Sequence, residues 1–387
     1  MKQIQAIRNR FFPKPNILPS GFFAFQSPPE ASRPYRMHLR LEKDGTGVLV
    51  VNAQTVLHLN QTAAELAYHI VNYDSVEVSA REIAKRYNVP EAKALEDAID
   101  FQERIHSLID TPDLDPVMFL DFNRVDPYST EISAPYRLDC ALTYQTGDET
   151  PNSAPTYRVT RELVTDEWKT ILLKAWQVGI PQIVFTGGEP TIRPDLVELI
   201  SITENQGQVA GLLTNGKRLA EPEYLHRLLD SGLDHVMIVL DPESTQAWEA
   251  IRDVSKEDLF MTVHLTLTHQ NVHKVIDILK KLLVIMDDTR SLSLSAEHPD
   301  LSTELASVRD QAILMGFNLV WDLPVPYSAL NPVSVEMENG NVTPKGEGNA
   351  WLYVEPDGDV LPDQGVKKML GNILKDEWAT IWQNCGH

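Results

Sequence analysis

Residues 182–190 read Gln-Ile-Val-Phe-Thr-Gly-Gly-Glu-Pro, and they decide the fold. The apolar run predicts a short buried strand over residues 182–186, which the two glycines end. Because glycine has no Cβ, the backbone at Gly187 and Gly188 can approach a ligand closely, and a carboxylate fixed at Glu189 can accept hydrogen bonds from an ammonium group. The competing interpretation is a plain Gly-Gly turn followed by an exposed acid.

From Arg137 onward, short apolar runs alternate with helical patterns. Strands are expected at residues 138–144, 182–186, 209–213, 235–240, 261–267, 291–295 and 318–322, with helices at 165–178, 194–205, 222–230, 272–285 and 303–315. Such alternation requires right-handed crossovers and a parallel sheet, here long enough to curl into a full or partial βα barrel of α/β class. Ligands are then expected at the C-terminal ends of the strands.

Polar residues follow two further expected strands. Thr214 and Asn215 end the third strand, and Asp241 ends the fourth. Both positions lie where barrel sites form, but Asn-Gly and Asp-Pro are also turn dipeptides, so turn formation and helix capping remain an equal alternative. His264 and Thr266 are expected on one face of the fifth strand, where a single histidine is usually a hydrogen-bonded core residue.

Upstream, residues 142–153 read Leu-Thr-Tyr-Gln-Thr-Gly-Asp-Glu-Thr-Pro-Asn-Ser. Together with the Gly-Gly-Glu-Pro segment, this stretch resembles the opening of a radical S-adenosylmethionine (radical SAM) enzyme. In that family three cysteines spaced Cys-x3-Cys-x2-Cys hold a [4Fe-4S] cluster, and the matching positions here are Thr146, Thr150 and Ser153. A hydroxyl stays protonated at neutral pH and is a poor ligand for iron-sulfur clusters. We therefore expect the radical SAM scaffold without an iron-sulfur cluster.

The resemblance also implies a cofactor site. In the family the Gly-Gly-Glu-Pro motif holds the amino group of S-adenosylmethionine (SAM), and polar residues at strand ends contact its ribose and methionine portions. The implied SAM-binding residues are Gly187, Gly188, Glu189, Pro190, Thr214, Asn215 and Asp241. No catalytic residue is assigned. The histidines show no ligand spacing, and we predict no metal site.

Five segments are expected along the chain. Residues 1–35 form an irregular arm, 36–110 a small winged-helix-like domain, 111–134 a linker rich in proline and aspartate, 135–332 the barrel, and 333–387 a C-terminal extension.

The two flanking domains carry resemblances of their own. Residues 50–52, residues 57–60 and the last helix of the N-terminal domain resemble the peptide-recognition domain of pyrroloquinoline quinone biosynthesis, which implies that a precursor peptide adds as a strand to its hairpin. The C-terminal extension resembles the SPASM domain, which holds auxiliary clusters. In that family a cysteine follows the proline of this hairpin, and in this chain Asp363 follows Pro362 instead. We therefore expect no auxiliary cluster either.

Composition restricts the partners and the location. A formal net charge of -21 argues against non-specific nucleic-acid binding. No apolar run reaches the roughly 20 residues of a membrane span, and the N-terminus lacks the apolar core of a secretory signal. The 2 cysteines, Cys140 and Cys385, belong to no motif. These features favour a cytoplasmic protein that contacts neither nucleic acid nor membrane.

Loss of ligands at two cluster sites favours a pseudoenzyme or binding module for a peptide, a SAM-like ligand or a partner enzyme. Two alternatives remain open. The first is an enzyme that uses SAM without a cluster for polar group transfer, and the second is a radical SAM peptide maturase with substitute ligands. The substrate and the oligomeric state are not determined by the sequence.

Overall fold

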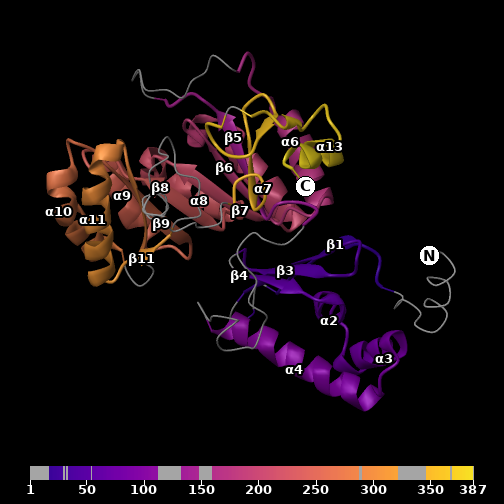
Figure 1. Ribbon diagram of the computed structural model, residues 1–387. Coiled ribbons are helices and arrows are strands. Elements are labelled where there is room, and N and C mark those ends of the chain that lie inside the picture. The colour runs from indigo at the N-terminus through magenta and orange to yellow at the C-terminus, as the bar shows by residue number, and fades with distance from the viewer. Residues whose placement is uncertain are drawn as a thin grey trace. The chain divides into compact units, whose positions relative to one another are not determined.

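A computed structural model describes residues 17–28, 31, 34–53, 55–111, 132–147, 159–286, 290–320, 346–366 and 368–386. The chain divides into two compact units between Ile132 and Ser133, and each unit has its own sheet (Figure 1). Among the described helices, none combines the length and the hydrophobicity that a membrane crossing requires.

The N-terminal unit is an antiparallel sheet followed by three helices. The elements are β1 (Gly21–Gln26), β2 (Arg36–Leu41), β3 (Gly47–Val51), β4 (Thr55–Leu59), α2 (Gln61–Val71), α3 (Val76–Tyr87) and α4 (Glu91–Asp110). The strands pair in the order β1-β2-β3-β4. Asn60 caps α2 by accepting a hydrogen bond from the Ala63 N–H, and Ser75 caps α3 in the same way.

Strand β1 corrects the expectation of an irregular arm over residues 1–35. Residues 1–16 lie outside the described part, but residues 21–26 pair with β2 along their whole length. Phe23 and Phe25 pack against the core of this unit. In the sequence, the nearby prolines favoured a loop over a strand. The alternate positions of Phe23 and Phe25, which place both rings on one face of β1, were therefore overlooked.

The second unit carries a sheet whose first seven strands in chain order are all parallel. Its elements up to residue 320 are β5 (Arg137–Thr143), α6 (Thr165–Gln177), β6 (Gln182–Gly187), α7 (Leu196–Gln206), β7 (Val209–Thr214), α8 (Pro222–Asp230), β8 (His235–Val239), α9 (Thr245–Val254), β9 (Phe260–Leu267), α10 (Val275–Ile285), β10 (Ser291–Ala296), α11 (Ser302–Leu314) and β11 (Asn318–Leu319). Helices alternate with the strands as expected, which confirms the α/β fold (Figure 1). Helix α9 was missed, although its buried residues Trp248, Ile251 and Val254 recur at helical spacing.

The C-terminal residues extend the same sheet. Strand β12 (Trp351–Val354) runs parallel to β5, and β13 (Asp359–Leu361) and β14 (Gly371–Asn372) follow it antiparallel. The order is β11-β10-β9-β8-β7-β6-β5-β12-β13-β14. Helix α13 (Trp378–Asn384) then packs with β14. The proline-rich loop at residues 322–332, the expected linker residues 112–131, Thr150 and Ser153 lie outside the described residues.

His264 on β9 is buried and hydrogen-bonded, as the pattern of its strand predicts. Its side chain is 0% exposed, and its ring lies 3.0 Å from the Ser293 hydroxyl and 2.9 Å from that of Ser295. Burial lowers the pKa of His264 to about 3. The imidazole is therefore neutral in the folded protein at any pH near neutrality.

This burial predicts a specific loss of stability in mild acid. In the unfolded chain His264 binds a proton near pH 6.5, whereas in the folded chain it stays neutral down to about pH 3, so protons favour unfolding between those values. Between pH 7.5 and 5, the wild type should lose about 2 kcal/mol more free energy of unfolding than the His264→Asn variant. Urea denaturation at the two pH values measures the difference.

The matched control is His273→Asn, because His273 is exposed. This variant should keep the pH dependence of the wild type. Equal acid sensitivity of wild type and His264→Asn would contradict the burial of a neutral imidazole.

Candidate functional site

The two glycines after β6 allow two backbone segments to meet. The Gly188 N–H donates to the Thr143 carbonyl at 2.7 Å, and the Glu189 N–H donates to the Gln145 carbonyl at 2.8 Å. A Cβ on Gly187 would lie 2.1 Å from the Thr143 carbonyl oxygen, and one on Gly188 would lie 2.3 Å from that of Gln145. No side chain fits at either position, so the end of β5 is locked against the end of β6.

Glu189 connects the turn after β6 to the end of β7 at the C-terminal edge of the sheet. Its Oε1 accepts hydrogen bonds from the Thr191 N–H at 3.0 Å and from the hydroxyls of Thr191 and Thr214 at 2.6 and 2.7 Å. Its Oε2 accepts one from the Asn215 N–H at 2.7 Å. The side chain is only 2% exposed, so these bonds form in a setting where an unpaired carboxylate would be costly.

The other expected site residues lie along the same edge. Pro190 begins a short 3₁₀ turn (Pro190–Ile192), and the Asn215 side chain accepts from the Lys217 N–H at 2.9 Å. Asp241 is exposed after β8, where its carboxylate accepts from the Glu243 N–H at 3.0 Å. The side chains of Asn215 and Asp241 thus make the turn contacts that the Asn-Gly and Asp-Pro dipeptides predict. They also lie at the strand ends, where a barrel binds ligands.

Two charged residues hold the base of the loop that follows β5. Glu162 accepts hydrogen bonds from the Thr143 hydroxyl at 2.6 Å and from the Tyr144 N–H at 3.1 Å. Arg193 donates to the carbonyls of Leu142 and Leu163, both at 3.1 Å. The loop that contains Thr146 therefore leaves and rejoins the barrel at a fixed point.

Sequence reasoning missed Glu162 as a residue of this site. Its partner Thr143 lies 19 residues earlier in the chain, and no spacing rule relates the two. The position of Arg193 is fixed in turn by Asp195, whose carboxylate receives the guanidinium at 2.9 and 2.7 Å. This Arg-carboxylate fork holds the pKa of Asp195 below its ordinary value, against the opposing effect of burial.

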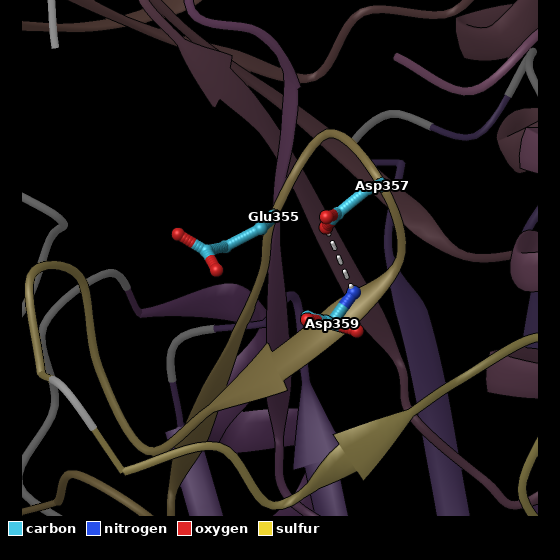
Figure 2. A group of neighbouring side chains, drawn as sticks. All are labelled: Glu355, Asp357 and Asp359. Carbon is cyan, nitrogen blue, oxygen red and sulfur yellow. Dashed lines mark hydrogen bonds between the residues drawn. The ribbon is translucent and has the colours of Figure 1, made fainter. Parts of the chain in front are cut away.

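The hairpin between β12 and β13 brings three carboxylates together (Figure 2). Glu355, Asp357 and Asp359 each have one oxygen within 4.8 Å of the others. Glu355 accepts from the Tyr144 hydroxyl at 2.9 Å, and Asp359 accepts from the Asn372 side chain at 2.8 Å. The group is thus engaged in bonds that tie the hairpin to β5 and β14, and we assign no metal to it.

Comparison with known proteins finds similarity to one superfamily. Residues 140–282 match the family model of the radical SAM superfamily. The fold is similar to that of Streptococcus suis SuiB bound to S-adenosylmethionine, with a TM-score of 0.58 and 15% identity over 93% of this chain and 88% of that one.

Two curated relatives are PqqA peptide cyclases. The protein from Rhodopseudomonas palustris is 36% identical over 242 residues, which cover 54% of this chain and 61% of the relative. The protein from Bradyrhizobium diazoefficiens is 26% identical over 259 residues, which cover 58% of this chain and 66% of the relative. The chain therefore spans less than two thirds of each of these relatives.

These similarities correct two expectations. The expectation of a pseudoenzyme is wrong, because the relatives are named as enzymes that act on a peptide. The expectation that no iron-sulfur cluster is bound is also contradicted, because the radical SAM match and the cyclase relatives imply such a cluster together with SAM. The resemblances of the N-terminal and C-terminal domains, and the SAM-binding residues, remain predictions.

The described cysteines do not fit a cluster of the usual kind. Cys140 is fully buried within β5, and burial together with the neighbouring Asp139 raises the pKa of its thiol. Burial raises the pKa of Cys385 to about 11. Since the thiolate is the form that binds metal, neither side chain is prepared as a ligand, and Thr146 offers a hydroxyl. The described donor set therefore does not supply a cysteine-held cluster.

The backbone contact at Gly188 gives a direct test of this site. Gly188→Ala places a methyl group against the Gln145 carbonyl, so the ends of β5 and β6 must separate. We expect the free energy of unfolding to fall by about 3 kcal/mol, the upper end of the usual cost of overpacking. Guanidinium denaturation followed by tryptophan fluorescence measures the change.

Gly365→Ala is the matched control. Gly365 has a φ of 76° and nothing within 4 Å of an added Cβ, so this variant carries backbone strain without a collision. It should cost about 1 kcal/mol. If the two variants were equally stable, Gly188 would not be held by a close backbone approach.

Proposed function

We propose that the protein is a SAM-dependent enzyme that modifies a peptide. The observation that carries this proposal is the similarity of the chain to PqqA peptide cyclases, up to 36% identity over 242 residues. The match of residues 140–282 to the radical SAM family model and the arrangement of polar groups at the strand ends support it. The proposal agrees with the alternative that the sequence left open, a peptide maturase of the radical SAM type.

The geometry at Glu189 suits the amino group of SAM. A carboxylate oxygen has two lone pairs, and among the described residues Glu189 Oε2 accepts a single hydrogen bond, from the Asn215 N–H. The second lone pair is available to an ammonium group, while the bonds to Oε1 hold the carboxylate in place. SAM, when bound, would supply the reactive methyl or adenosyl group, and the role of Glu189 is to orient it.

The N-terminal unit is the proposed docking site for the peptide. Strand β4 lies at one edge of its sheet, next to β3. The resemblance of this unit to a peptide-recognition domain implies that an extended peptide pairs with a strand edge through main-chain hydrogen bonds. An edge strand offers such bonds in a row, which is the reason that peptide segments add there.

A selection followed by a mass measurement tests the proposal. A displayed library of random 30-residue peptides is selected on the immobilised full-length protein, and the enriched peptides are incubated with SAM, with and without dithionite. We expect at least one peptide to change mass only when SAM is present. Formation of 5′-deoxyadenosine would identify reductive cleavage of SAM, and S-adenosylhomocysteine would identify methyl transfer.

Glu189→Gln and Glu243→Gln form the matched pair of variants. Glu243 is 82% exposed near the end of β8 and is not part of the proposed site, so its replacement should leave peptide modification unchanged. The Glu189 variant should lose at least tenfold in rate. A protein that enriches no peptide, or that leaves every enriched peptide unmodified, would contradict the proposed function.

A further inference from the structure

All three polar groups of Thr191 are engaged in hydrogen bonds. Its N–H and its hydroxyl donate to Glu189 Oε1, at 3.0 and 2.6 Å. Its carbonyl oxygen accepts from the Arg218 guanidinium and, at 3.3 Å, from the Tyr224 hydroxyl. Thr191 is 0% exposed, so a polar group there that lost its partner would be costly. Thr191 therefore connects Arg218 and Tyr224 to the carboxylate of Glu189.

Arg218 reaches Thr191 from the segment that follows β7. The end of β7 binds Glu189 directly, and a turn at Gly216 then leads into a short 3₁₀ helix (Lys217–Ala220). Gly216 has a φ of 77°, a conformation that costs glycine little and other residues more. The segment after β7 thus contacts the turn after β6 at two points, which are the Glu189 carboxylate and the Thr191 carbonyl.

Tyr224 on α8 contacts Arg218 and donates to the same carbonyl. Cζ of Arg218 lies 3.9 Å from the centre of the Tyr224 ring, which is the geometry of a cation–π contact. Tyr224 is 4% exposed, and burial raises the pKa of its hydroxyl to about 12. The hydroxyl therefore keeps its proton at neutral pH. Because a guanidinium is not deprotonated in proteins, both donors to the Thr191 carbonyl are present under assay conditions.

We propose that Arg218 and Tyr224 are positioning residues that make the site selective for ligands with an amino group. They hold Thr191, and Thr191 holds Oε1 of Glu189, so that Oε2 is kept in place for an ammonium group. The inference rests on the proposed function, in which Glu189 binds the amino group of SAM. It adds the side chains on which that binding depends, neither of which contacts SAM itself.

The position of a carboxylate decides how well it binds an ammonium group. A charged hydrogen bond is short, and a binding group must lie within about 0.5 Å of its productive position. Loss of Arg218 leaves the Thr191 carbonyl with the longer bond to Tyr224 alone, so the turn that carries Glu189 can shift. The adenosine part of SAM does not bind Glu189 in this proposal. Binding of a ligand without an amino group should therefore be insensitive to Arg218.

Helix α8 supplies a matched control. Arg227 also lies over the Tyr224 ring, 5.4 Å from its centre, and its side chain is exposed. Among the described residues, the donors to the Thr191 carbonyl are Arg218 and Tyr224, not Arg227. Arg227→Met thus removes the same charge and the same kind of ring contact as Arg218→Met. It should leave ligand binding unchanged.

The test is a calorimetric titration of three ligands into the full chain and its variants. SAM and decarboxylated SAM carry the amino group, whereas 5′-methylthioadenosine lacks it. Arg218→Met should weaken binding of the first two ligands about tenfold, and Tyr224→Phe, which removes only a neutral hydroxyl, about threefold. Neither variant should change the affinity for 5′-methylthioadenosine. Circular dichroism establishes that each variant is folded, and Tyr224→Phe is the variant that disturbs packing least.

A double variant tests whether the effect passes through Glu189. Adding Arg218→Met to Glu189→Gln should weaken SAM binding no further than Glu189→Gln alone, because residues that act through one group are not additive. Independent, additive losses would show that Arg218 acts by another route and would overturn the inference.

The outcomes separate this inference from the proposed function. A wild type that binds SAM no better than 5′-methylthioadenosine would overturn the inference and leave a SAM-binding enzyme. The same follows if Arg218→Met weakens all three ligands equally, changes none of them, or behaves like Arg227→Met. A wild type that binds neither SAM nor decarboxylated SAM would overturn the proposed function as well.

Discussion

The carboxylate of Glu189 is the interaction on which the site depends. It receives hydrogen bonds from Thr191, Thr214 and Asn215, and so joins the end of β6 to the end of β7. Each buried donor that lost this acceptor would cost about 1–3 kcal/mol. The adjacent glycines let the end of β5 approach to hydrogen-bonding distance, and Glu162 and Arg193 hold the loop that follows β5. The strand ends are therefore set before any ligand arrives, which is the preorganisation that a cofactor site requires.

The sequence predicted the barrel well because its signals are local. The apolar runs at residues 209–213 and 291–295 became strands β7 and β10, and the expected helix at 222–230 became α8. Features that depend on distant contacts were missed. Strand β1 acquires its partner only when β2 forms. Helix α9 is an exception, because it was missed although its buried residues recur at helical spacing.

The site followed the same rule. The Gly-Gly-Glu-Pro motif was recognised from its pattern, and the position of Glu189 at a strand end is the one expected. Its bonds to Thr214 and Asn215 span 25 and 26 residues and follow from the parallel register of β6 and β7 rather than from the motif. The hydroxyl at Thr146 led to the expectation of an inactive protein, and the resemblance to PqqA peptide cyclases overturned it.

The central claim is that Glu189 holds the strand ends in the geometry that binds SAM. Calorimetric titration of SAM into the wild type, Glu189→Gln and Glu243→Gln tests it most directly, with circular dichroism to establish that each variant is folded. A glutamine cannot accept from the Asn215 N–H through its NH₂ group, so binding should weaken at least tenfold in that variant, while the wild type and the Glu243 variant bind alike at micromolar SAM. A wild type that does not bind SAM, or a folded Glu189 variant that binds as tightly as the wild type, would contradict the account.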